Sequence, residues 1–158
     1  MHSQTSFETE RGISGVSVSR GFSLVIVSGI PEFEPTKRLE AFRVLKGGEI
    51  SLDFLKLSPT GFTFILAEKD AEKAVAKLCE AGFEANCVPG RAIVTVNAAN
   101  IRDENGLVAR IAQTIVRSNA TIEQVGDMHS SVQVVVDEKV ADAVEAALRD
   151  CIGKMEIL

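Results

Sequence analysis

The sequence predicts an α+β fold in which one set of strands and helices occurs twice. Three observations support this. First, Gly21 and Gly90 each precede an apolar, strand-like run, and 69 residues separate them (90 − 21). Second, each run leads through a polar loop into an amphipathic, helix-like segment. Third, each copy continues with two strand-like runs, one of clear apolar alternation, and then a second amphipathic segment.

The first copy begins with the leading strand FSLVIVS, residues 22–28, followed by a loop that ends near Pro35. The runs EISLDFLKL (49–57) and GFTFILA (61–67) then predict two strands. The helices are indicated by apolar residues at helical spacing, which are Leu39, Phe42 and Leu45 in the first, and Ala71, Ala74, Val75 and Leu78 in the second. Gly47-Gly48 and Gly82 are expected to end these helices.

The second copy repeats this order. Its leading strand is RAIVTVN, residues 91–97, and its later strands are TIEQV (121–125) and SVQVVVD (131–137). The apolar positions of its helices are Leu107, Val108, Ile111 and Ile115 in the first, and Val140, Val144, Leu148 and Cys151 in the second. Gly153 is expected to end the last helix.

Each copy still needs one more strand to close a sheet. Three segments compete for this position: residues 12–19, 82–88 and 154–158. The first two lead through a glycine-containing turn into a leading strand, which predicts a hairpin over 12–28 and favours strands that precede their copies. We therefore expect modules at 10–81 and 82–158, with 1–9 as a flexible terminus.

The resulting plan is a four-stranded, mostly antiparallel sheet with both helices on one face, the split βαβ or ferredoxin-like arrangement. Right-handed crossovers place the two helices on the same side of the sheet. This plan hosts many unrelated functions, so the function must come from the residues.

Composition excludes several classes of function. Acidic residues number 22 against 17 Lys plus Arg, giving a net charge of −5, and there is no basic stripe for a nucleic acid. Apolar runs are too short for a membrane span, and no secretory signal is apparent. Three cysteines without a CxxC pair indicate neither disulfides nor a metal site. We expect a cytoplasmic protein without cofactor.

Catalysis is poorly supported, because His2 and His129 have no partner evident in the sequence. A binding module fits better. Loops that end at helix N-termini offer free backbone N–H groups, which suit the carboxylate of a free amino acid. The acidic residues that could meet its ammonium group are Glu32 and Glu34 in the first loop, and Asp103 and Glu104 in the second. Gly106 would allow the backbone a close approach to a ligand, and Asp103 or Asn105 is expected to cap the following helix.

Residues 100–137, NIRDENGLVARIAQTIVRSNATIEQVGDMHSSVQVVVD, resemble the second ACT module of aspartokinase regulatory domains. The matching loop positions are Ile101, Arg102, Asn105, Gly106, Leu107 and Ala109, and the matching strand positions are Ile122 and Val134-Val135-Val136-Asp137. Ile13-Ser14-Gly15-Val16 and Ile50-Ser51-Leu52-Asp53 are similar to two further strands of that family. The resemblance covers roughly residues 10–158.

The resemblance implies two ACT modules with strands exchanged between them and a homodimer whose sheets join side by side. It also implies an amino-acid effector, usually lysine or threonine, at module or dimer interfaces. No phosphate-binding start of a kinase occurs in the chain, so a non-catalytic regulatory subunit, with a kinase chain as its partner, is expected. The residues to which the resemblance and the loop chemistry assign the ligand are Ile30, Pro31, Glu32, Phe33, Glu34, Leu57, Ser58, Arg102, Asp103, Glu104, Asn105 and Gly106.

Two departures from the family pattern support an alternative. The first loop has no glycine before its helix, and Phe33 is placed to fill the ligand gap. In the second loop Asn105 replaces a proline. The alternative is a structural dimerisation subunit of an aspartokinase-like enzyme, with a degenerate effector site.

Overall fold

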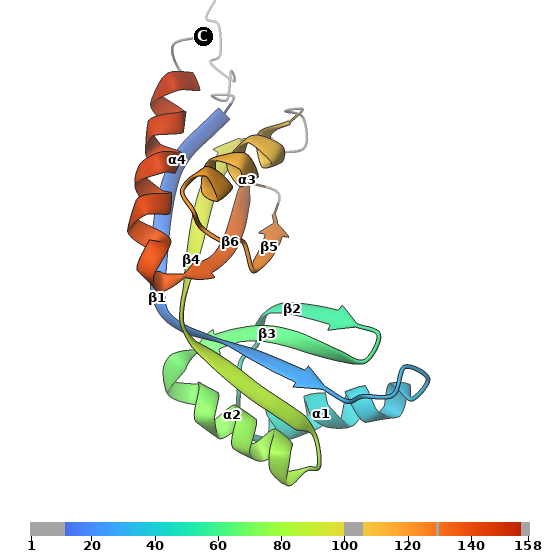
Figure 1. The fold of residues 1–158 in the computed structure, drawn as a ribbon. Helices are drawn as coiled ribbons and strands as arrows, with labels where there is room; N and C mark the ends of the chain where they lie inside the picture. The colour runs from blue at the N-terminus through green and yellow to red at the C-terminus, as the bar shows by residue number, and fades with distance from the viewer. Residues whose placement is uncertain (1–11, 100–105, 129, 156–158) are drawn as a thin grey trace, which may run out of the picture. The chain divides into compact units, whose positions relative to one another are not determined.

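The computed structural model describes residues 12–99, 106–128 and 130–155, which divide into two compact units (Figure 1). The central unit is Arg20–Arg91. The terminal unit combines the residues up to Ser19 with those from Ala92 onward. Each unit has its own hydrophobic core, and two long strands, β1 (Gly12–Ser28) and β4 (Glu84–Ala99), contribute one half to each.

The hairpins predicted at Gly21 and Gly90 are wrong, because β1 and β4 each continue through their glycine as one strand. Both glycines adopt the positive φ that a turn would use, 81° and 69°. The strands nevertheless remain neighbours in the sheet order on both sides of these glycines. Gly15 lies near Asn97, and Ser28 contacts Glu84, so β1 and β4 run antiparallel.

The module boundaries predicted at 10–81 and 82–158 therefore do not coincide with the compact units. The fourth strand of the central unit is the start of β4, which follows the second helix of the first copy, and not a strand that precedes that copy. The fourth strand of the terminal unit is the first half of β1. Residues 154–155, in the third candidate segment, belong to the last helix. The expected exchange of strands between modules is confirmed.

In the central unit the strands lie in the order β2-β3-β1-β4. The elements are α1 (Pro35–Gly47), β2 (Asp53–Ser58), β3 (Gly61–Ala67) and α2 (Glu68–Glu80). β3 pairs antiparallel with β1, Val27 opposite Phe62, and with β2, Ser58 opposite Gly61. Both helices cover one face (Figure 1). As the alternation predicted, Phe62, Phe64 and Leu66 lie in the core beneath them.

In the terminal unit the order is β1-β4-β6-β5, which places β1 at a sheet edge. The elements are α3 (Leu107–Arg117), β5 (Gln124–Asp127), β6 (Ser131–Asp137), a 3-10 turn (Glu138–Val140) and α4 (Ala141–Met155). Val132, Val134 and Val136 fill the core together with Val16 of β1. None of the helices in the described ranges combines the length and apolar character needed to cross a bilayer.

Candidate ligand site of the central unit

The loop between β1 and α1 is a compact turn. Gly29 ends the strand with a positive φ of 74°, and the Glu34 N–H donates to the Pro31 carbonyl at 3.1 Å. Pro35 occupies the first turn of α1, as predicted, where its missing N–H costs no helical hydrogen bond. Glu34 stands at the N-cap but makes no side-chain capping bond.

Backbone carbonyls of the turn between β2 and β3 accept hydrogen bonds from this loop and from the helix that follows it. The Ile30 N–H donates to the Thr60 carbonyl at 2.9 Å. The guanidinium of Arg38, on α1, donates to three neighbouring carbonyls, those of Ser58, Pro59 and Gly61. Four successive carbonyls of the turn thus bind the loop or its helix. This arrangement brings the predicted site residues of the first loop close to the predicted Leu57 and Ser58.

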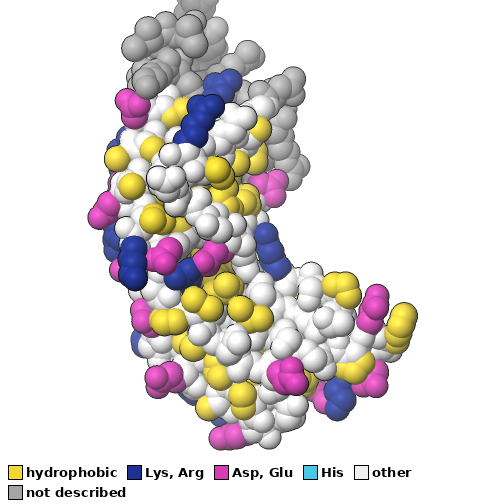
Figure 2. Space-filling model, viewed as in Figure 1, with side chains coloured by type: hydrophobic (Ala, Val, Ile, Leu, Met, Phe, Trp, Pro, Cys, Tyr) yellow, Lys and Arg dark blue, Asp and Glu magenta, His cyan; other side chains and the backbone are white. Residues whose placement is uncertain are grey.

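The side chains of the loop between β1 and α1 are not all exposed or buried as the sequence predicted. Phe33 is 89% exposed, so it does not fill a gap inside the loop as expected. Glu32 and Glu34 are also exposed, and Figure 2 shows acidic and hydrophobic side chains together over this loop. Ile30, in contrast, is buried in the core of the central unit. Its side chain therefore anchors the loop, and because its N–H is bonded to Thr60, only its carbonyl is left for a ligand.

A pocket of about 240 Å³ lies between this loop and the turn that joins α2 to β4. Its lining consists of Ser28, Gly29, Ile30, Pro31, Lys37, Ala81, Gly82, Phe83 and Glu84. Only Ile30 and Pro31 of these were predicted site residues. No local motif marks Lys37 or Glu84, because they meet the loop only through folding: Ser28 donates to the Glu84 carboxylate, 56 residues away, at 3.4 Å.

The second predicted loop is described only at its end. Arg102, Asp103, Glu104 and Asn105 lie outside the described residues, as does His129. Gly106 occupies the N-cap of α3 with a left-handed φ of 83°, and its carbonyl accepts the Arg110 N–H at 2.9 Å. Nothing lies within 4 Å of a Cβ at this position, so its φ, not crowding, favours glycine here.

The described residues contain no cluster of three or more His, Cys, Asp or Glu side chains suited to a metal ion. The candidate site consists instead of hydrogen-bond donors and a few charges on a small pocket. That donor set suits a small polar metabolite.

Each unit thus places two helices on one face of four antiparallel strands, one of them an exchanged half-strand, and the two units together have the fold of a pair of ACT modules. Solved structures of regulatory aspartate kinase chains share this fold. The ligand-free regulatory subunit of aspartate kinase from Thermus thermophilus superposes with a TM-score of 0.81 at 20% identity, over 89% of this chain and 97% of that chain. Aspartokinase III of E. coli, solved with lysine and aspartate, matches with a TM-score of 0.74 at 15% identity, over 92% and 34%.

The chain thus has the fold of the regulatory region of aspartate kinases, as its sequence resemblance predicted. Among curated proteins, Aspartokinase 1 of Bacillus subtilis (strain 168) is 27% identical over 107 residues, covering 68% of this chain. The chain spans about a quarter of the length of that relative, 26%. No family model matches the chain.

Proposed function

We propose that the chain is a non-catalytic regulatory protein that binds a small amino acid, such as lysine or threonine, and modulates a partner enzyme of the aspartate kinase type. The observation that carries this proposal is the loop after β1, fastened to the β2–β3 turn by Ile30 and Arg38 while its acidic side chains stay exposed. A loop held in one shape loses little conformational entropy when a ligand binds. The likeness to regulatory subunits supports the same function.

The proposed effector contacts remain those of the first loop, Ile30 to Glu34, together with Leu57 and Ser58. The Glu34 and Lys37 N–H groups donate within the loop, so the other backbone N–H groups near the start of α1 are the ones that suit the carboxylate of an amino acid. Glu32 and Glu34 suit its ammonium group or a cationic side chain. In the sequence of the second copy, residues 102–106 follow the leading strand as the first loop does, and a packing or interface role is proposed for them.

Regulation by such a ligand requires two arrangements of the protein with different affinities. An amino acid that binds one arrangement of the modules, or of a homodimer, more tightly shifts the population towards it by that difference in affinity. The partner enzyme then responds because it interacts differently with the two arrangements. E. coli aspartokinase III, which shares the fold, was solved with lysine and aspartate bound, which suits an effector of this class.

Isothermal titration calorimetry tests the sensing function directly. The purified protein is titrated with each of the common L-amino acids, and with D-lysine and D-threonine as stereochemical controls. We expect heat with at least one L-amino acid and a much weaker response to its D form. If no amino acid produces a signal at millimolar concentration, the sensing function is wrong.

A structural dimerisation subunit is the second candidate, and one observation favours it. Phe33 is 89% exposed and Leu57 is 60% exposed, and large exposed apolar side chains often mark protein contacts. Light scattering on wild-type protein and on Phe33→Ser separates the candidates. A dimer that dissociates in the variant, with no response to amino acids, supports scaffolding. If Phe33→Ser leaves the dimer intact, the exposed Phe33 no longer supports the dimerisation function.

A further inference from the structure

We infer that the pocket between the first loop and the α2–β4 turn is itself an amino-acid site, in which Glu84 with Ser28 takes the ammonium group and Lys37 takes the carboxylate. This inference rests on the proposed function, because it assumes a zwitterionic ligand. It differs in location, since neither Leu57 nor Ser58 lines this pocket. The ligand class is an α-amino acid with a small side chain.

The size of the pocket limits the ligand. Sites for drug-sized molecules typically enclose about 300–1,000 Å³. At about 240 Å³ this pocket falls below that range, which suits a ligand the size of a free amino acid. Pro31 and Phe83 supply apolar surface, while Ser28, Lys37 and Glu84 supply the polar groups. A few polar groups on a partly apolar wall are what fix the orientation of a small ligand.

The two charged side chains have capacity left for a ligand. Glu84 accepts one long bond, 3.4 Å from the Ser28 hydroxyl, which leaves most of its acceptor positions unused. An ammonium group offers three donors and could bind both oxygens at once. Lys37 lies 3.6 Å from Glu40 in an ion pair whose side chains are about half exposed, 49% and 52%. Such pairs are weak, so Lys37 can turn to a ligand carboxylate at little cost.

Gly29 leaves room for the Glu84 carboxylate. Its φ of 74° is one that other residues adopt only with strain, and an added Cβ would lie 3.1 Å from Glu84 Oε2. That distance requires the carboxylate to move by a few tenths of an ångström. Gly82, on the opposite wall, has a φ of 90° but no atom within 4 Å of an added Cβ. Alanine at Gly29 therefore disturbs both backbone and carboxylate, whereas alanine at Gly82 strains only the backbone.

Calorimetry on paired variants tests the site. Glu84→Gln and Lys37→Met each remove one charge from the pocket. Their matched controls are Glu72→Gln and Lys73→Met, which remove the same charges from exposed positions of α2 outside the pocket. We expect Kd for the best amino acid to rise about tenfold or more in each pocket variant, the scale of one charged hydrogen bond, and to change less than twofold in the controls. Gly29→Ala should weaken binding more than Gly82→Ala.

The outcomes separate this inference from the proposed function. If wild-type protein binds an amino acid and both pocket variants bind it equally well, the pocket is not the site, while the sensing function stands. If wild-type protein binds no amino acid, both fail. Backbone NMR of the wild type gives an independent measurement: ligand should shift the amide signals of Gly29, Gly82 and Glu84, and shifts confined to Leu57 and Ser58 would overturn the inference.

Discussion

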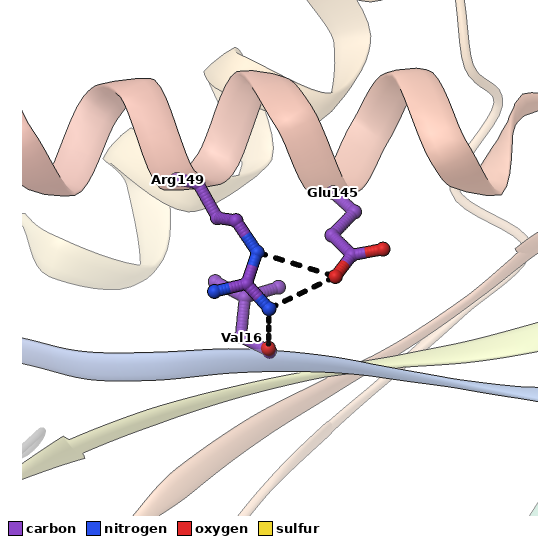
Figure 3. A network of polar contacts seen from close by, with 3 residues as sticks. All are labelled: Val16, Glu145 and Arg149. Atoms are coloured by element: carbon purple, nitrogen blue, oxygen red, sulfur yellow. Dashed lines mark hydrogen bonds and ion pairs between the residues drawn. The ribbon is translucent and has the colours of Figure 1, made fainter.

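Arg149 Nη2 of α4 donates a hydrogen bond of 2.7 Å to the carbonyl oxygen of Val16 in β1, across 133 residues of sequence (Figure 3). The same guanidinium is held by Glu145, one helical turn earlier, through bonds of 2.9 and 3.2 Å to Oε1. Val16 lies in the half of β1 that forms the edge of the terminal sheet. Arg149 thus supplies a donor for an edge carbonyl and ties the exchanged strand to the last helix.

Arg149→Met should lower the free energy of unfolding of the terminal unit by about 1 kcal/mol, because a charged hydrogen bond is lost while the apolar stem is kept. The loss is expected to be no larger, because the ion pair of Arg149 with Glu145 is partly exposed to solvent. Urea denaturation measures it. Arg43→Met is the control, since Arg43 is exposed and makes no hydrogen bond or ion pair with any residue that the structure describes. If Arg149→Met and Arg43→Met lowered the free energy of unfolding equally, the hydrogen bond between Arg149 and Val16 would not be what stabilises the terminal unit.

Val16 and Val25 lie on one strand but belong to different cores. Val16→Ala should therefore speed amide hydrogen exchange in α4 and β6, and Val25→Ala should speed it in α2 and β3. Removing two buried methyl groups costs about 1–3 kcal/mol, enough to raise exchange roughly tenfold or more where opening is local. Hydrogen-exchange mass spectrometry resolves the two patterns. The same pattern in both variants would mean that the strand is not divided between the units.

Gly61 is required by a close backbone approach. A Cβ at this position would lie 2.0 Å from the Val27 carbonyl oxygen, and that neighbour is backbone, so it cannot turn aside. Gly61→Ala should lower the free energy of unfolding by about 3 kcal/mol or more, as overpacking of a rigid site does. Gly47→Ala, at a helical position with nothing within 4 Å, should be neutral or stabilising by up to about 1 kcal/mol. Thermal melting compares them, and equal melting temperatures would contradict the crowding.

Arg38 should control the shape of the candidate ligand loop. All three carbonyls accept from one nitrogen of Arg38, Nη2. Arg38→Lys keeps the charge but ends in an ammonium group on a shorter side chain, which does not reach the same position. We expect faster amide exchange at Ile30 and in the β2–β3 turn, and weaker amino-acid binding, with little change in the terminal unit. Arg43→Lys, on the same helix, serves as the control. Unchanged exchange at Ile30 would show that the carbonyl contacts do not hold the loop.

The sequence by itself determined the local elements of this protein. Alternating Phe62, Phe64 and Leu66 predicted a strand with an apolar face in the core, and Pro35 could begin a helix but not lie inside one. The repeat predicted two modules of one plan, and the resemblance predicted their fold. These features depend on periodicity and on single-residue geometry, which are visible in a short stretch of chain.

Only the tertiary structure decided which strands complete which sheet, and where the pocket lies. Gly21 and Gly90 tolerate a positive φ in a hairpin and in a continuous strand alike, so local sequence cannot choose between them. The choice is made by burial of Val16 in a core formed mostly from residues beyond Ala92. The contact of Ser28 with Glu84, and with it the pocket, follows from that distant strand pairing. Side chains 56 residues apart become neighbours only when the sheet has formed, because no local pattern records a long-range pairing.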